Sequence, residues 1–191
     1  MAKKTMEYVL EINRAISGLE NLEIKHDPLF DEDKMANASF IDSARKRHGL
    51  IIEAAFRDAF VERGFDCRKY VATDIGIEID AVIISPEKNL VLGVDVKRGT
   101  SFHDSGKKRS MEQDAPRAKA ALDKLAESYH LSGATVYFGY YHHYSQSNRS
   151  HVEPITALEI EYLTGVDVRR MITIATENYK DRLNDYTKEQ I

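Results

Sequence analysis

A carboxylate and an ammonium group stand two residues apart in a short apolar segment. Residues 90–96 have the composition of a buried strand, and alternation along it puts Asp95 and Lys97 on one face while the intervening apolar side chains pack on the other. Gly93 shares the face of Asp95 and leaves room for a ligand or a metal to approach the backbone. We therefore expect this strand to carry charged groups that can act on a bound substrate.

The preceding predicted strand, 75–84, supplies a second carboxylate. Alternation puts Glu78 and Asp80 on one face of this strand and an apolar set on the other face, namely Ile77, Ile79, Ala81 and Ile83. A turn at 85–89 would pair the two strands as a hairpin and bring Asp80 near Asp95.

Two carboxylates in a partly buried site repel each other, and a divalent cation relieves that repulsion. An all-oxygen set made of Asp80, Asp95, the backbone carbonyl of Val96 and several waters is what Mg²⁺ prefers. Such an ion polarises a phosphodiester and lowers the pKa of a bound water. Lys97 would then orient or deprotonate the water, or neutralise the scissile phosphate.

These residues resemble the PD-(D/E)xK nuclease superfamily, which has the fold of most type II restriction endonucleases. The matching residues are Asp80 at the end of one strand and Asp95-Val96-Lys97 on the next, with Ile79 in the place of the superfamily's proline. The resemblance implies that a glutamate of the first core helix completes the metal site. Glu53 closes a Gly-x-x-x-Glu run of the expected form in the apolar part of a predicted helix, so it is the fourth candidate catalytic residue.

The resemblance implies a Mg²⁺-dependent endonuclease, with Mn²⁺ as a substitute ion, that hydrolyses double-stranded DNA. Its most specific form is a type II restriction enzyme of a restriction-modification system, acting as a homodimer that places one site on each strand of a palindrome. A structure-selective or repair nuclease of the same superfamily remains open, as does a DNA-binding module without catalysis. The sequence has no Gly-x-x-x-x-Gly-Lys-Ser/Thr loop, so we expect no nucleotide cofactor.

The elements that position these residues can be read from the apolar periodicity. Helical spacing predicts helices, and β-branched and aromatic runs predict strands, over the following residues: helices at 4–17, 42–62, 112–129, 155–163 and 167–183, and strands at 70–72, 75–84, 90–96 and 134–140. The order helix, three strands, helix, strand predicts an α/β fold with a mixed central sheet flanked by helices, the αβββαβ core of the superfamily, over about 42–140. The helices at 4–17 and within 155–185 would be additions to a single nuclease domain of residues 1–191.

Basic residues gather directly after the predicted catalytic strand. From Lys97 to Lys124 eight basic residues stand against four acidic ones, in a chain whose net charge is −4. This distribution suits a polyanion bound by one face, although a solvated helix and loop give the same count. We expect phosphate contacts from Arg98, Thr100, Ser101, His103, Lys107, Lys108 and Arg109, and contacts to base edges from His142, Asn148 and Arg149 in a loop at 141–151.

Each assignment has an ordinary structural alternative. Asp95 and Lys97 could form exposed cross-strand ion pairs with the carboxylates of the neighbouring strand, which contribute little to stability. Glu53 could pair with Arg57 one helical turn later. The neighbouring residues His142 and His143 have no further ligands at the spacing of a zinc site.

Three features bear on where the protein works. Cys67 is the single cysteine, so no internal disulfide can form. The first residues lack the apolar segment of a secretory signal, and no apolar run approaches the roughly 18–20 residues that cross a bilayer. We therefore expect a cytoplasmic protein that is not inserted in a membrane.

Overall fold

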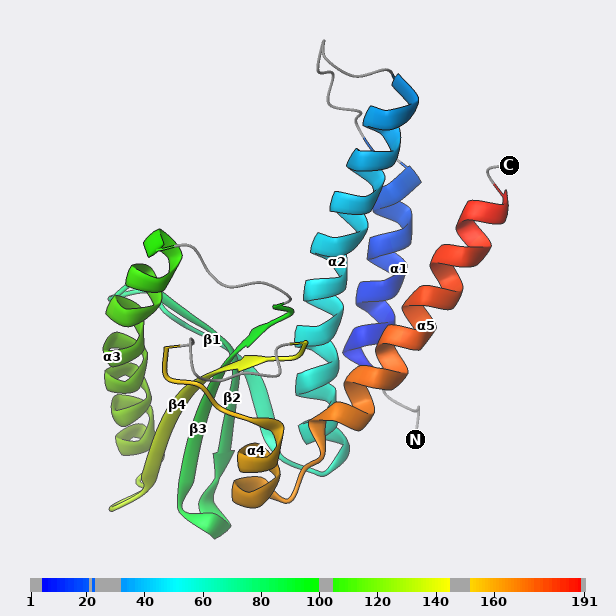
Figure 1. The fold of residues 1–191 in the computed structure, drawn as a ribbon. Helices are drawn as coiled ribbons and strands as arrows, with labels where there is room; N and C mark the ends of the chain where they lie inside the picture. Colours follow the sequence, from blue (N-terminus) through cyan, green and yellow to red (C-terminus); the bar gives the residue numbers. More distant parts are fainter. Residues whose placement is uncertain (1–4, 21, 23–31, 100–104, 145–151, 190–191) are drawn as a thin grey trace. The chain divides into compact units, whose positions relative to one another are not determined.

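The computed structural model describes residues 5–20, 22, 32–99, 105–144 and 152–189. Its elements, in chain order, are α1 (Glu7–Glu20), α2 (Glu32–Glu62), β1 (Asp66–Ala72), β2 (Ile77–Ser85), the 3-10 turn η1 (Pro86–Lys88), β3 (Leu90–Lys97), α3 (Ser105–Ser128), β4 (Thr135–His142), α4 (Ala157–Thr164) and α5 (Val168–Glu189). They form an α/β fold in which helices flank a four-stranded mixed sheet (Figure 1). This coarse fold class is the one predicted from the sequence.

The sheet has the strand order β1-β2-β3-β4. β1, β2 and β3 are antiparallel neighbours, as expected for strands joined by short turns, while β4 returns through α3 and pairs with β3 in parallel. The turn between β2 and β3 closes with Asn89 in the left-handed conformation, at φ 47°.

Contacts divide the chain into two compact units, one made of residues 1–55 and 172–191 and the other of residues 56–171. The prediction of one domain over the whole chain stays a prediction.

The second unit has its core between α3 and one face of the sheet (Figure 1). α3 is amphipathic, and its buried side chains recur at helical spacing: Met111, Ala115, Ala118, Ala121, Leu122 and Ala126. At the end of α2, the fully buried Phe56 packs against the sheet, with its ring centroid 5.6 Å from that of Tyr141 in β4.

The first unit is helical. Described contacts join α5, from Ile172 onward, to the first part of α2 and to α1. The Tyr179 hydroxyl donates to the Ala44 carbonyl at 3.2 Å, His48 Nε2 lies 3.1 Å from Thr176 Oγ1, and the Asn178 amide donates to the Tyr8 hydroxyl at 3.4 Å. None of the described helices has both the length and the apolar character needed to cross a bilayer.

Two predicted boundaries in the first unit are wrong. α1 continues past Gly18 to Glu20. The guanidinium of Arg47 lies where a Cβ at Gly18 would be, so this glycine permits close packing and does not end the helix. α2 begins ten residues earlier than residue 42. Half of the ten added residues are apolar, and the ring of Phe40 stacks on that of Tyr186 in α5, a tertiary contact that periodicity does not reveal.

Candidate active site

Asp80 lies at an irregularity in β2. In the pairing of β1 with β2, Arg68 faces Val82 and Tyr70 faces Ile79, so Asp80 and Ala81 together stand opposite one residue of β1. This two-against-one count is a β-bulge, which shifts the alternation of side chains by one position. The predicted apolar face of β2 is therefore wrong beyond Ile79, because the extra residue puts Ile77, Ile79, Val82 and Ile84 into the same core under α3.

The carboxylate of Asp80 is buried and accepts a backbone hydrogen bond. Its Oδ2 lies 2.8 Å from the amide nitrogen of Val96, and the residue is 6% exposed. The β2–β3 ladder runs from Ser85↔Leu90 to Ala81↔Val94, so the Val96 amide lies beyond the last pair of the ladder. The Asp80 carboxylate accepts the hydrogen bond that a strand carbonyl would accept inside the ladder.

Lys97 joins this carboxylate to that of Asp95. The Lys97 Nζ is 2.8 Å from Asp95 Oδ2 and 3.4 Å from Asp80 Oδ2. The three side chains are 27%, 16% and 9% exposed for Lys97, Asp95 and Asp80 respectively, so this is not a solvated surface pair. The structure thus brings together the three strand residues singled out from the sequence. Glu78, the other acid of the strand, is exposed and pairs instead with Lys69 at 2.6 Å.

The electrostatics show that negative charge is poorly compensated here. Burial raises the pKa of Asp95 from 3.8 to about 7, with Asp80 adding to the rise and Lys97 opposing it. Tyr140, which stands opposite Asp95 in β4, has its pKa raised by burial and by the charges of Asp95 and Asp114. Its hydroxyl donates to the Met111 carbonyl at 3.2 Å, so Tyr140 is a neutral side chain opposite Asp95.

The donor set fits Mg²⁺. Two carboxylates offer only oxygen, and Mg²⁺ is commonly held by one or two carboxylates while it keeps several waters. Within the described ranges no group of three or more His, Cys, Asp or Glu residues is arranged to hold a metal, so a site of many protein ligands is not formed there. The Val96 carbonyl stays a predicted ligand. Glu53 is half-buried on α2 in the first unit, and its part in the site also stays a prediction.

Comparison of the chain with protein-family models, with curated proteins and with solved structures found no match.

The space beside Gly93 is filled by protein. A Cβ placed there would lie 2.5 Å from Leu122 Cδ1 of α3 and 3.3 Å from Phe138 Cδ2 of β4. The expectation that Gly93 leaves room for a ligand or metal is wrong, because α3 occupies that room. The glycine instead lets α3 pack closely on β3.

His142 does not lie in a surface loop. β4 extends two residues further than predicted because Tyr141 and His142 pair with Val96 and Lys97, and His142 is only 7% exposed. A buried side chain is poorly placed to read base edges, so we leave His142 out of the proposed DNA surface.

The remaining predicted DNA contacts divide into three groups. Lys108 and Arg109 are exposed on α3, which begins at Ser105 and so includes part of the predicted loop. Arg98 is half-buried, with its guanidinium 5.6 Å from the centroid of the Tyr144 ring. The others lie outside the described residues: Thr100, Ser101, His103, Asn148, Arg149 and the side chain of Lys107.

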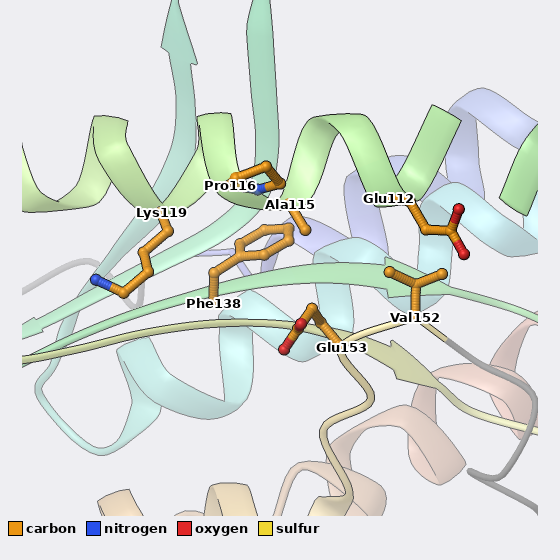
Figure 2. Close-up of a pocket in the computed structure, with 7 residues that line it drawn as sticks. All are labelled: Glu112, Ala115, Pro116, Lys119, Phe138, Val152 and Glu153. Atoms are coloured by element: carbon orange, nitrogen blue, oxygen red, sulfur yellow. The ribbon is translucent and has the colours of Figure 1, made fainter. Parts of the chain in front are cut away.

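A surface pocket of about 330 Å³ lies elsewhere in the second unit, between α3 and β4. Figure 2 shows Ala115 and Pro116 of α3 beside the ring of Phe138, with Val152 and Glu153 coming from the segment before α4. Neither acid nor lysine of the candidate site lines this pocket, so its mixed lining is separate from the proposed chemistry.

One residue of the site was not singled out from the sequence for a role there. Arg57, near the end of α2, is 8% exposed and donates from Nη1 to the backbone carbonyl of Asp80 at 2.7 Å. From the sequence it was considered only as an ion-pair partner of Glu53. The available signal was its position among the apolar residues of the helix, where a cation needs buried acceptors.

Proposed function

We propose that this chain is a Mg²⁺-dependent endonuclease that hydrolyses phosphodiester bonds in double-stranded DNA, built on a restriction-endonuclease-like core. The observation that carries the proposal is the convergence of Asp80 and Asp95, from neighbouring strands, on the ammonium of Lys97. The order α2, β1, β2, β3, α3, β4 is the element order of the superfamily that the sequence resembles, which adds support.

The two acids and the lysine would have different tasks. Asp80 and Asp95 would hold the ion, which would supply Lewis-acid polarisation of the phosphate and a bound water of lowered pKa. Lys97, with its amine already between the carboxylates, would turn toward the phosphate or the water when the ion compensates the acids. The amide of Val96 fixes the Asp80 carboxylate, so little reorganisation is needed when the substrate arrives.

The main structural alternative is an ion-pair network that only closes the end of the sheet. Surface ion pairs cost little to keep, but here two carboxylates share one ammonium in a largely buried place, and the pKa of Asp95 rises to about 7 as a result. Apolar residues of similar size would stabilise the fold more than these buried charges do. An arrangement that costs stability in this way is typical of functional sites.

The first test is cleavage of plasmid DNA of known sequence by the purified chain with Mg²⁺. Asp80→Asn, Asp95→Asn and Lys97→Met should each lower the cleavage rate at least about 100-fold, while DNA binding persists. Asn at position 80 keeps an acceptor for the Val96 amide, so the loss reports charge and not folding. Glu53→Gln should be milder and partly rescued by Mn²⁺. Glu78→Gln is the matched control, an exposed carboxylate of the same strand that should keep full activity.

The product pattern tests the narrower proposal of a type II restriction enzyme. Discrete fragments would support it, whereas preferred cleavage of branched DNA would favour a structure-selective nuclease. Binding of DNA without hydrolysis in Mg²⁺ or Mn²⁺ would contradict the enzyme proposal and favour a binding module. Wild-type rates in both Asp80→Asn and Lys97→Met would mean that these residues play no part in any cleavage.

A further inference from the structure

A buried side chain from another element donates a hydrogen bond to the backbone of Asp80. Arg57 lies between the fully buried Phe56 and Phe60 on α2, and the hydrogen bond from its Nη1 to the Asp80 carbonyl, at 2.7 Å, is itself buried. A guanidinium is costly to bury unless its N–H groups meet acceptors. This contact is therefore part of what holds Arg57 in place.

The Asp80 carbonyl needs such a donor because of the bulge. The β1–β2 ladder pairs Arg68 with Val82 and Tyr70 with Ile79, and it skips Asp80 and Ala81. A bulge leaves the backbone groups of its extra residue out of the ladder, and a buried carbonyl with no donor costs roughly 1–3 kcal/mol. Arg57 supplies the donor that the neighbouring strand does not.

The bulge also lets Ile79 and Asp80 point to the same face of the sheet. Ile79 faces α3 on the same face as Val91, and strict alternation along β2 would give that face to Ile79 or to Asp80 but not to both. With the extra residue, Ile79 stays in the core while Asp80 continues the β2–β3 register beyond Ala81↔Val94 to the position opposite Asp95, and residues opposite each other share a face. Its carboxylate then meets the Val96 amide and Lys97.

We infer that Arg57 is a positioning residue of the proposed site: by donating to the Asp80 carbonyl it holds the bulge that lets the Asp80 carboxylate face Asp95 and Lys97 while Ile79 stays in the core. The consequence for catalysis rests on the proposed function. The geometric part concerns the metal-free protein alone.

The amide of Val96 reports this geometry directly, because its hydrogen bond ends on the Asp80 carboxylate. In the metal-free, folded chain, Arg57→Met should shift the Val96 amide resonance and speed its hydrogen exchange, measured by NMR. It should also weaken Mg²⁺ binding in calorimetric titration by about 10- to 100-fold, the usual effect of losing a group that orients a metal ligand. Arg57→Lys should restore part of both, since an ammonium can also donate to the carbonyl.

Arg63→Met is the matched control, an exposed arginine just after α2 that should change neither quantity. If Arg57→Met does not fold, Arg57→Gln is measured instead, with the same expected direction. A variant that only lowers the melting temperature, with the Val96 amide and the Mg²⁺ affinity of the folded protein unchanged, would overturn the inference. Failure of the wild-type chain to cleave DNA would count against the proposed function alone, because the amide measurement needs neither metal nor DNA.

Discussion

Asp95 is the residue whose chemistry depends most on its surroundings. It stands between two opposing influences, burial that favours the neutral acid and the ammonium of Lys97 at 2.8 Å that favours the carboxylate, and burial is the larger. With a pKa of about 7, Asp95 changes charge within the range where most enzymes work. A cation that replaces water beside it would draw the group to the ionised form, so metal binding should release protons near neutral pH.

The same pKa predicts how stability depends on pH without metal. The folded chain keeps a proton on Asp95 that the unfolded chain releases above its ordinary pKa of 3.8, so stability falls as pH rises from about 4 to about 7 and then levels off. In the Asp95→Asn variant the side chain does not titrate, so this fall in stability should be absent. Relative to wild type, the variant should gain roughly 2–4 kcal/mol in free energy of unfolding between about pH 4 and about pH 8, measured by urea denaturation. An equal pH dependence in both proteins would contradict the raised pKa.

The sequence was sufficient for some of these residues and not for others. The shared face of Asp95 and Lys97 follows from alternation along β3, and a hairpin turn is enough to bring Asp80 near them. Arg57 was missed as part of the site because its partner is a backbone carbonyl 23 positions away, and such a contact leaves no pattern in side-chain types.

At the scale of the elements, β2 shows why alternation along the sequence predicted the wrong apolar face. From Ile79 to Ser85 the residues of this strand are all buried, and most are apolar, so both faces look alike in the sequence. A bulge in such a strand changes which residues share a face without changing the composition. The extended start of α2 and the two added residues of β4 were missed for a related reason, since contacts with α5 and pairing with β3 set those boundaries.

The packing of α3 on β3 gives a prediction at this scale. Gly93→Ala should destabilise the fold by roughly 1–3 kcal/mol, because the new methyl group would overlap the fully buried Leu122. Leu122→Ala should relieve the overlap, so the double variant should lose less stability than the two single losses added together. Denaturant melts of the four proteins measure the coupling. Additive losses, or a Gly93→Ala protein of full stability, would mean that α3 does not fill this space.

For the whole molecule, the distribution of charge matters more than its total. The chain has a net charge of −4, yet the stretch after β3 is basic, and exposed Lys108 and Arg109 stand in the first turns of α3. The same helix also carries Lys119, which pairs with Asp123 at 3.1 Å one turn away. Polyanion binding would therefore be local to one region of a protein that otherwise repels nucleic acid.

This asymmetry predicts how DNA binding responds to salt. If Lys108 and Arg109 contact phosphates, the double change Lys108→Gln and Arg109→Gln should weaken binding alike for all sequences and reduce the slope of log affinity against log salt by about 2, one unit for each lost contact. Lys119→Gln removes another exposed cation of α3, one whose charge is already paired with Asp123, so it should leave the slope nearly unchanged. Fluorescence anisotropy with a labelled duplex, in Ca²⁺ to prevent cleavage, measures each slope. A slope that the double change does not alter, or that Lys119→Gln lowers as much, would show that DNA does not approach the protein over the start of α3.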